Sequence, residues 1–279
     1  MVIENINGSL IRNEFKLRVY TEYSVPSIRY LLMTHELTDT QLNSLDHIHT
    51  NAIKSWLQMK PKGPTPAFLF SPDGLNLKRI SDIYVESHTV LYGRTMTLAD
   101  NRTKNALQSK LERQSQWTTK MAHNGIKVWD SVYNKAINSS SEPVSKWTKI
   151  KKTIQEILMQ KRSDYWRDYI CPLIQQGRML EFISLEQSDL TWRSIIYNLP
   201  RGVLSFAVRS SIDFLPTLSN LKCWGKRTNA HCQLCKNNES LCHVLNNCSV
   251  SLNQGRYTWR HDSILRHIVQ LLASGFLHQ

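Results

Sequence analysis

Apolar side chains recur every three or four positions along most of this sequence, which is the spacing of helices that bury one face. The clearest run begins at a T-x-x-Q capping box, Thr38 to Gln41, and continues with apolar residues on one face from Leu42 to Leu57. Further helices are predicted over Ile80–Leu98, from Val144 onward, at 189–198, at 201–214, and around 264–272. Because strand signals are scarce, the predicted fold class is mainly α.

Two segments break this helical pattern. Residues 60–77 are rich in Pro and Gly, so we predict a loop there, with a short extended piece at Ala67–Phe70. The sequence NSSSEP at 138–143 is the clearest linker.

The composition is that of a globular protein, with 41% hydrophobic residues and eight Trp, which argues against disorder over the whole length. No apolar run approaches the ~18 residues that span a bilayer. The N-terminus lacks a basic segment followed by an apolar core, so it does not resemble a signal peptide. We therefore expect an intracellular protein, in which clustered cysteines bind metal more often than they form disulfides.

The charge is strongly basic, with 35 Lys and Arg against 22 Asp and Glu and a formal net charge of +13. Residues 1–50 have a small acidic excess, whereas residues 101–150 and 201–279 each contain nine basic and three acidic residues. A basic excess in particular segments indicates a polyanionic partner, and nucleic acid is the commonest one.

Four of the six cysteines lie between His231 and Cys248. Cys232, Cys235, His243 and Cys248 give the spacing C-x2-C-x7-H-x4-C, and three thiolates with one imidazole are an accepted ligand set for structural Zn²⁺. Such a unit is too small to fold without its metal.

Two alternatives compete with this ligand set. His231 adjoins Cys232, and Cys242 adjoins His243. We prefer His243, because Cys242 lies one residue farther from Cys248 and exceeds the usual spacing of a second ligand pair. A redox role for the C-x-x-C pair would need a β-α-β context that the pattern does not contain.

Basic residues accompany the predicted zinc site. A zinc ion with four protein ligands has no open position, so it is structural and does not activate water. Lys226, Arg227 and Lys236 flank it and favour nucleic acid as the partner, while Trp224 is expected to cover the site.

Two other helices carry candidate phosphate contacts. Lys149 and Lys152 lie opposite the apolar arc of their helix, and Arg256 and Arg260 share one face of the last helix if that helix begins by Gln254. Unpaired charge is costly to bury, so these side chains must meet water, carboxylates or phosphates.

The sequences HVLNNC and GRYTWRHD, together with the knuckle spacing, resemble the zinc-binding stretch of non-LTR retrotransposon proteins of the restriction-like-endonuclease class. The stretch YSVPSIRYLLMTHELTDTQLNSLD and the later GPTPAFLFSPDGLNLKRISDIY are similar to the thumb of the same reverse transcriptases. The resemblance implies a helical thumb-like domain at 1–110, a helical linker at 111–220, a zinc knuckle at 221–253 and an amphipathic helix at 254–279.

The chain departs from this family where catalysis is concerned. It contains no Asp-Asp pair, which the polymerase needs to hold its metal ions, and about 30 residues follow the knuckle where an endonuclease is expected. Asp164 and Asp168 lie four apart on a helix, but neighbouring basic residues indicate surface ion pairs there.

We therefore expect a truncated retroelement product that is not an enzyme. It would bind DNA or element RNA, in the nucleus, with one structural Zn²⁺ and no membrane association. The alternative is a zinc-dependent protein–protein adaptor derived from a retroelement.

Overall fold

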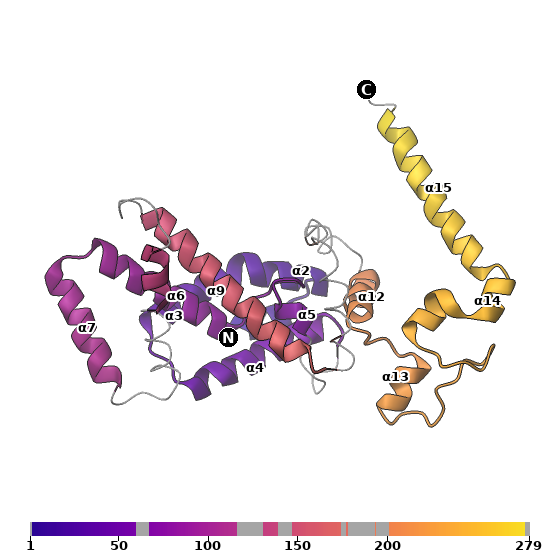
Figure 1. Ribbon diagram of the computed structural model, residues 1–279, viewed down its shortest axis with the longest axis horizontal. Helices are drawn as coiled ribbons and strands as arrows, with labels where there is room; N and C mark the ends of the chain where they lie inside the picture. The colour runs from indigo at the N-terminus through magenta and orange to yellow at the C-terminus, as the bar shows by residue number, and fades with distance from the viewer. Residues whose placement is uncertain are drawn as a thin grey trace. The chain divides into compact units, whose positions relative to one another are not determined.

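The computed structural model describes residues 2–59, 67–115, 131–138, 147–173, 177, 193 and 201–276 (Figure 1). They belong to two compact units, Met1–Val208 and Arg209–Gln279, which we name unit 1 and unit 2. The regular elements of the described residues are helices, with one isolated antiparallel bridge between His231 and Asn238. The predicted mainly α class is thus confirmed. None of the described helices combines the length and the apolar character that crossing a bilayer requires.

The helices of unit 1 are α1 (Val2–Gly8), α2 (Asn13–Val19), the π-helix η1 (Tyr20–Ser24), α3 (Val25–Thr34), α4 (Asp39–Trp56), α5 (Ala67–Phe70), α6 (Ile80–Leu98), α7 (Asn101–Ser115), a helix at 131–138, and α9 (Trp147–Ile170). Helix α12 (Arg201–Ser211) spans the boundary between the two units. The helices of unit 2 are α13 (Leu218–Cys223), the π-helix η2 (His243–Asn247), α14 (Ser249–Asn253) and α15 (Arg256–Phe276).

Most predicted helices are present with shifted ends. The helix predicted from Val144 is described from Trp147 onward, and the one predicted at 201–214 ends at Ser211. The last helix begins at Arg256, after Gly255 takes a φ of 64° at the end of α14. The helix predicted at 189–198 lies outside the described residues, apart from position 193. The linker predicted at 138–143 also lies outside them, apart from position 138, which ends the helix at 131–138.

The capping box that starts α4 is confirmed. Thr38 Oγ1 accepts a hydrogen bond from the Gln41 backbone N–H at 3.3 Å, and Gln41 Oε1 accepts one from the Thr38 N–H at 2.9 Å. Most of the apolar stripe that follows is buried, including Ile53 and Trp56, whereas Leu45 is exposed.

The prediction of an extended piece at Ala67–Phe70 was wrong, because these residues form the single helical turn α5. All four side chains are buried, so the turn has no polar face from which a helical period could be recognised. The chain then folds back over it, with the Leu75 N–H bonded to the Phe68 carbonyl at 2.7 Å. Gly74 is required in this return, since a Cβ there would lie 1.9 Å from the Phe68 carbonyl oxygen.

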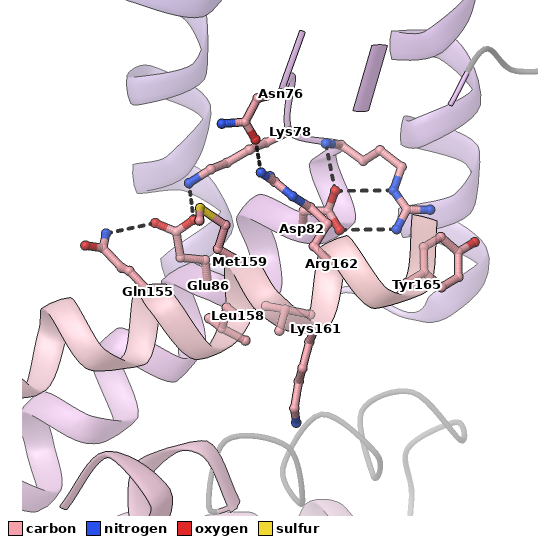
Figure 2. A pocket seen from close by; sticks show the side chains of 12 residues that line it. Asn76, Lys78, Asp82, Glu86, Gln155, Leu158, Met159, Lys161, Arg162 and Tyr165 are labelled. Carbon is pink, nitrogen blue, oxygen red and sulfur yellow. Dashed lines mark hydrogen bonds and ion pairs between the residues drawn. The ribbon is translucent and has the colours of Figure 1, made fainter. Parts of the chain in front are cut away.

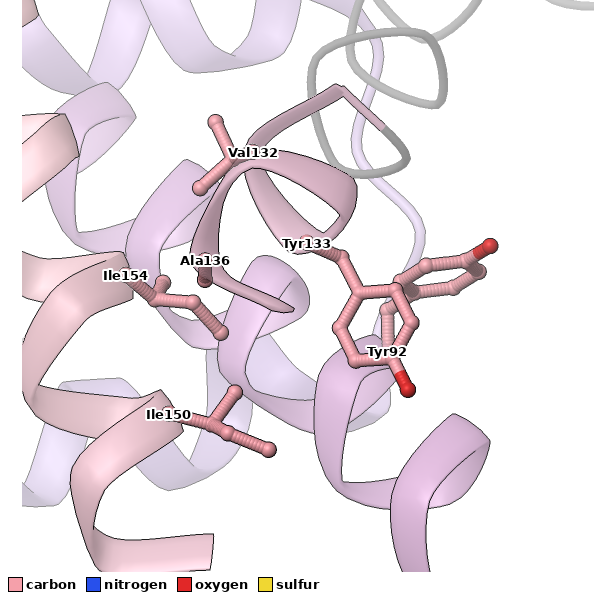
Figure 3. Close-up of a cluster of buried hydrophobic side chains, with 6 residues drawn as sticks. All are labelled: Tyr92, Val132, Tyr133, Ala136, Ile150 and Ile154. Carbon is pink, nitrogen blue, oxygen red and sulfur yellow. The ribbon is translucent and has the colours of Figure 1, made fainter. Parts of the chain in front are cut away.

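One hydrophobic cluster joins three helices of unit 1 (Figure 3). It consists of Tyr92 from α6, Ile150 and Ile154 from α9, and Val132, Tyr133 and Ala136 from the 131–138 helix. Gly93 allows a close approach here, because an added Cβ would lie 3.1 Å from Ile154 Cδ1. Helix α9, from the predicted linker at 111–220, therefore packs on α6, from the predicted thumb-like segment at 1–110.

His49 of α4 is completely buried among aromatic rings in unit 1. Its ring centroid lies 4.7 Å from that of Tyr20 and 6.0 Å from that of Phe70, and neither ring nitrogen has a hydrogen-bond partner among the described residues. Burial disfavours the charged form and lowers the pKa of His49 to about 4. The folded protein therefore holds a neutral imidazole at pH values where an exposed histidine is protonated.

This burial predicts acid sensitivity. Between pH 6.5 and 4 the unfolded chain protonates His49 and the folded chain does not, so the unfolding free energy falls as pH falls through that window. From pH 7 to 5 the loss from this one group is about 2 kcal/mol. Between pH 7 and 5, the unfolding free energy of the His49→Phe variant should therefore fall by about 2 kcal/mol less than that of the parent chain. Urea unfolding at both pH values measures this difference. The exposed His47→Gln is the matched control, and equal losses in the parent and His49→Phe chains would contradict the assignment.

Candidate metal centre

A tight turn presents the first two cysteines. The Cys232 N–H bonds to the Asn237 carbonyl at 2.7 Å, and the Lys236 N–H bonds to the Cys232 carbonyl at 3.0 Å. Lys236 takes a left-handed φ of 64°, which closes the turn. Since Cys232 and Cys235 are the ends of the C-x-x-C pair inside this turn, both thiols can face one point.

A π-helix presents the other two residues. Helix η2 begins at His243, whose N–H bonds to Ser240 Oγ at 3.2 Å, and it ends just before Cys248. A π-helix closes i→i+5 hydrogen bonds, so its wide turn keeps residues five positions apart nearer to one face than an α-helix does. His243 and Cys248 are five positions apart and converge on the cysteine turn.

The structure brings together the four residues that the sequence selected. One ligand atom from each of Cys232, Cys235, His243 and Cys248 lies within 4.8 Å of all the others. Cys235 Sγ and His243 Nε2 lie 3.3 Å apart. Cys232, His243 and Cys248 are buried, and Cys235 is half-buried. A tetrahedral ion with bond lengths of about 2.0–2.3 Å fits among ligand atoms at such separations after a small contraction.

Both competing ligands lie outside the cluster. His231 and Cys242 are exposed, and Cys242 Sγ is contacted instead by Asn247 Nδ2 at 3.4 Å. Among the described residues this is the one group of three or more His, Cys, Asp or Glu side chains arranged to hold a metal ion.

Hydrogen bonds favour the thiolate form of two ligands. The side chain and backbone of Ser251 lower the pKa of Cys248 to about 6, and the backbone N–H of Cys235 lowers the pKa of Cys232. Burial raises the pKa of Cys235. The pKa of His243 is raised, chiefly by its hydrogen bond to Cys232. A metal ion bound here would displace the protons of these ligands, since thiolates and a neutral imidazole are the forms that bind metal.

Helix α15 supports the cluster through a residue that the sequence analysis did not select. The Tyr257 hydroxyl accepts a hydrogen bond from the Cys248 N–H at 3.2 Å and lies 3.2 Å from the His243 carbonyl oxygen, to which it donates. It therefore ties together the backbones of two of the four candidate ligands. The only sequence signal was its place in GRYTWRHD, just after the second ligand pair.

Arg260, a predicted phosphate contact, also reaches this region. Its guanidinium donates to the Leu245 carbonyl and, at 3.0 Å, to Asn246 Oδ1, and it lies over the Tyr257 ring with 5.2 Å to the centroid. The side chain thus caps η2, which gives it a structural role whether or not it meets phosphate.

The other predicted phosphate contacts are exposed. Lys226, Arg227 and Arg256 lie in unit 2, whereas Lys149 and Lys152 lie on α9 in unit 1. Lys152 is 3.8 Å from Glu156, a pairing between two well-exposed side chains.

Two further expectations concerned side chains that flank these sites. Trp224 packs on Phe214 with ring centroids 5.0 Å apart, and its expected role of covering the metal site stays a prediction. The surface ion pairs expected of Asp164 and Asp168 are not found among the described residues, and Asp164 accepts a hydrogen bond from Gln160 at 2.9 Å.

Comparisons with known proteins do not add to this picture, because the sequence matches no protein-family model and no curated protein.

Tyr257 provides a direct test of this arrangement. Replacing Tyr257 with Phe removes the hydroxyl that joins the Cys248 N–H to the His243 carbonyl, while keeping the ring under Arg260. Losing an outer support of metal ligands lowers metal affinity by about 10- to 100-fold. We expect Tyr257→Phe to bind Co²⁺, used as a spectroscopic probe, at least about tenfold more weakly. Trp259→Phe changes an exposed neighbouring ring and should leave the affinity unchanged, so equal losses in both variants would rule out the hydroxyl as the cause.

Proposed function

We propose that the four-residue cluster binds one structural Zn²⁺. The support is the donor set, since three thiolates and one imidazole match the closed tetrahedral sites of structural zinc. All four positions would belong to the protein, so the ion would stabilise the fold and would not activate water. In this proposal Zn²⁺ joins the C-x-x-C turn to η2 and α14.

We further propose that the chain binds nucleic acid through the surface around this site. The main support is that four basic side chains close in sequence to the candidate ligands are exposed: Lys222, Lys226, Arg227 and Lys236. Residues 209–279 contain eight Lys and Arg against three Asp and Glu, so few carboxylates are available to neutralise them. Cations that protrude into water and form no ion pair with a described residue suit a phosphate backbone.

The proposed role is binding without catalysis. A two-metal polymerase site requires clustered carboxylates, and the sequence contains no Asp-Asp pair. The resemblance of the knuckle and its flanks to retrotransposon proteins supports an origin in a retroelement and a nuclear location. Those two points belong to the proposal together with the nucleic-acid partner.

A protein–protein adaptor is the second candidate. Leu234 and Val244 are 45% and 47% exposed, and they lie next to the candidate ligands Cys235 and His243. Apolar side chains at such positions suit contact with a protein surface. Salt dependence separates the two candidates, because phosphate binding weakens steeply as salt rises.

The zinc proposal predicts about one zinc per chain in the purified protein, measured by elemental analysis. Cys248→Ser and His243→Ala should lose the metal, because each removes one of four converging ligands. Cys242→Ser and Cys223→Ser change exposed thiols outside the cluster and should keep it. If Cys242→Ser lost the metal and His243→Ala kept it, the ligand set would be wrong.

The nucleic-acid proposal predicts a change in salt dependence. Replacing Lys226 and Arg227 together with Gln should reduce the slope of log affinity against log salt by about 1.4 to 1.8, the share of two phosphate contacts. The measurement is fluorescence anisotropy of a labelled single-stranded oligonucleotide across a salt series. Lys226→Arg with Arg227→Lys keeps both charges and is the matched control, so it should keep the parent slope.

We replace this pair in preference to Arg256 and Arg260, because removing Arg260 would also release η2. Affinity should fall about equally for unrelated sequences, since phosphate contacts carry no base information. An unchanged slope in the Gln variant would remove these two residues from the interface. Absence of salt-dependent binding in the parent chain would favour the adaptor.

A further inference from the structure

Unit 1 contains a pocket of about 340 Å³ between α6 and α9 (Figure 2). Its lining residues come from α6 and its N-terminal approach on one side and from α9 on the other. The volume lies at the lower end of the range of small-molecule sites, about 300–1,000 Å³.

Both carboxylates of the pocket are already neutralised. Glu86, with a side chain only 8% exposed, forms ion pairs with Lys78 and, at 3.2 Å, with Arg29, and it accepts a hydrogen bond from Gln155. Asp82 pairs with Arg79 at 3.2 Å. These contacts lower the pKa of Glu86, since the cations stabilise its charged form. The pocket therefore presents no free negative charge to a ligand.

Two cations of the pocket form no direct ion pair with a described residue. Arg162 reaches from α9 toward Asn76 and donates to its Oδ1, its one hydrogen bond to a described residue (Figure 2). The Arg162 Nε is buried and has no partner there. Lys161 also lines the pocket and forms no ion pair with a described residue. In Figure 2 its side chain extends away from Asn76, on a four-carbon stem that leaves the ammonium free to turn.

Burial and neighbouring charges both act on these two groups. Burial lowers the pKa of Arg162, the charges of Asp82 and Glu86 partly offset this, and Arg79 lowers it again. Burial and Lys135 lower the pKa of Lys161. A half-buried guanidinium with an unpaired N–H and cationic neighbours costs free energy, unless an anion completes its hydrogen bonds.

The remaining wall is largely apolar. Val85, Leu158 and Met159 line the space, together with the ring of Tyr165. A ligand that fits must therefore place an anionic group at Arg162 and a compact apolar body against these side chains.

We propose that this pocket binds a small organic phosphate monoester, with the phosphate at Arg162 and Lys161 and a compact apolar body against Leu158 and Met159. The lining contains four cations, from Lys78, Arg79, Lys161 and Arg162, against the two carboxylates of Asp82 and Glu86. This excess of two positive charges matches a dianion, and a planar guanidinium fits two phosphate oxygens at once. This site lies in unit 1 and does not depend on the zinc or nucleic-acid proposals.

Calorimetric titration of the full chain with phenyl phosphate tests the assignment. Saturable one-to-one binding is expected, and it should be stronger than the binding of benzoate, a monoanion, and of phenol, which has no anionic group. Arg162→Gln removes the charge while Gln can still donate to Asn76, and it should weaken binding at least about tenfold. Arg167→Gln makes the same change at an exposed position on the same helix and should bind like the parent chain.

Lys161→Gln is the second variant, because an exposed lysine can be replaced without loss of folding. It should weaken binding severalfold, with the helical circular dichroism unchanged. The inference is overturned if the parent chain shows no saturable binding at millimolar phenyl phosphate. It is also overturned if benzoate binds equally well, or if Arg162→Gln and Lys161→Gln both bind as tightly as Arg167→Gln.

Discussion

Unit 2 depends on the convergence of three thiols and one imidazole on a single point. Its described residues bury few apolar side chains, chiefly Ile212, Leu215 and Ala230, besides the two cysteines Cys232 and Cys248. A core of that size contributes little free energy against the conformational entropy of about 70 residues. The tight cysteine turn, η2 and α14 are instead arranged around the four ligand atoms, and a bound ion would supply the missing stabilisation.

Helix α15 also supports the four-residue cluster, through side chains that contact its backbone. Tyr257 joins the backbones of Cys248 and His243, and Arg260 satisfies the carbonyl of Leu245 near the end of η2. The last four carbonyls of a helix have no partner within it, so a guanidinium at this end is stabilising. Basic residues in this unit therefore differ in role, since Arg260 stabilises the fold while Lys226 and Arg227 extend into water.

Unit 1 is held by helix packing and by one concentrated set of ion pairs. The apolar contacts of α6, α9 and the 131–138 helix bury Ile154 and Val132 completely. Glu86 forms ion pairs with Lys78 and Arg29 and accepts a hydrogen bond from Gln155, and these three partners come from separate segments. A buried carboxylate needs such partners, because an unpaired charge would be strongly destabilising there. This arrangement neutralises Glu86 in the α6–α9 pocket, where Arg162 and Lys161 form no ion pair with a described residue.

The sequence alone was sufficient for features that depend on residues close together in the chain. Helical spacing predicted α4, α6 and α9, the capping box placed the start of α4, and ligand spacing selected all four residues of the cluster. Hydrogen bonds between near neighbours and short loops restrict the conformations of such segments, so the order of their residues predicts their local structure. The all-apolar turn α5 was misread because a helix buried on every side has no period.

Only the tertiary structure decided which distant side chains meet. The role of Tyr257 at the candidate ligands, the capping of η2 by Arg260, the buried and unpartnered His49, and the pocket at Arg162 all depend on contacts between separate helices. A side chain in a helix can be assigned to a face from its neighbours in sequence, but not to a partner. The partner is set by how the helices pack, which depends on the summed burial of many residues across the unit.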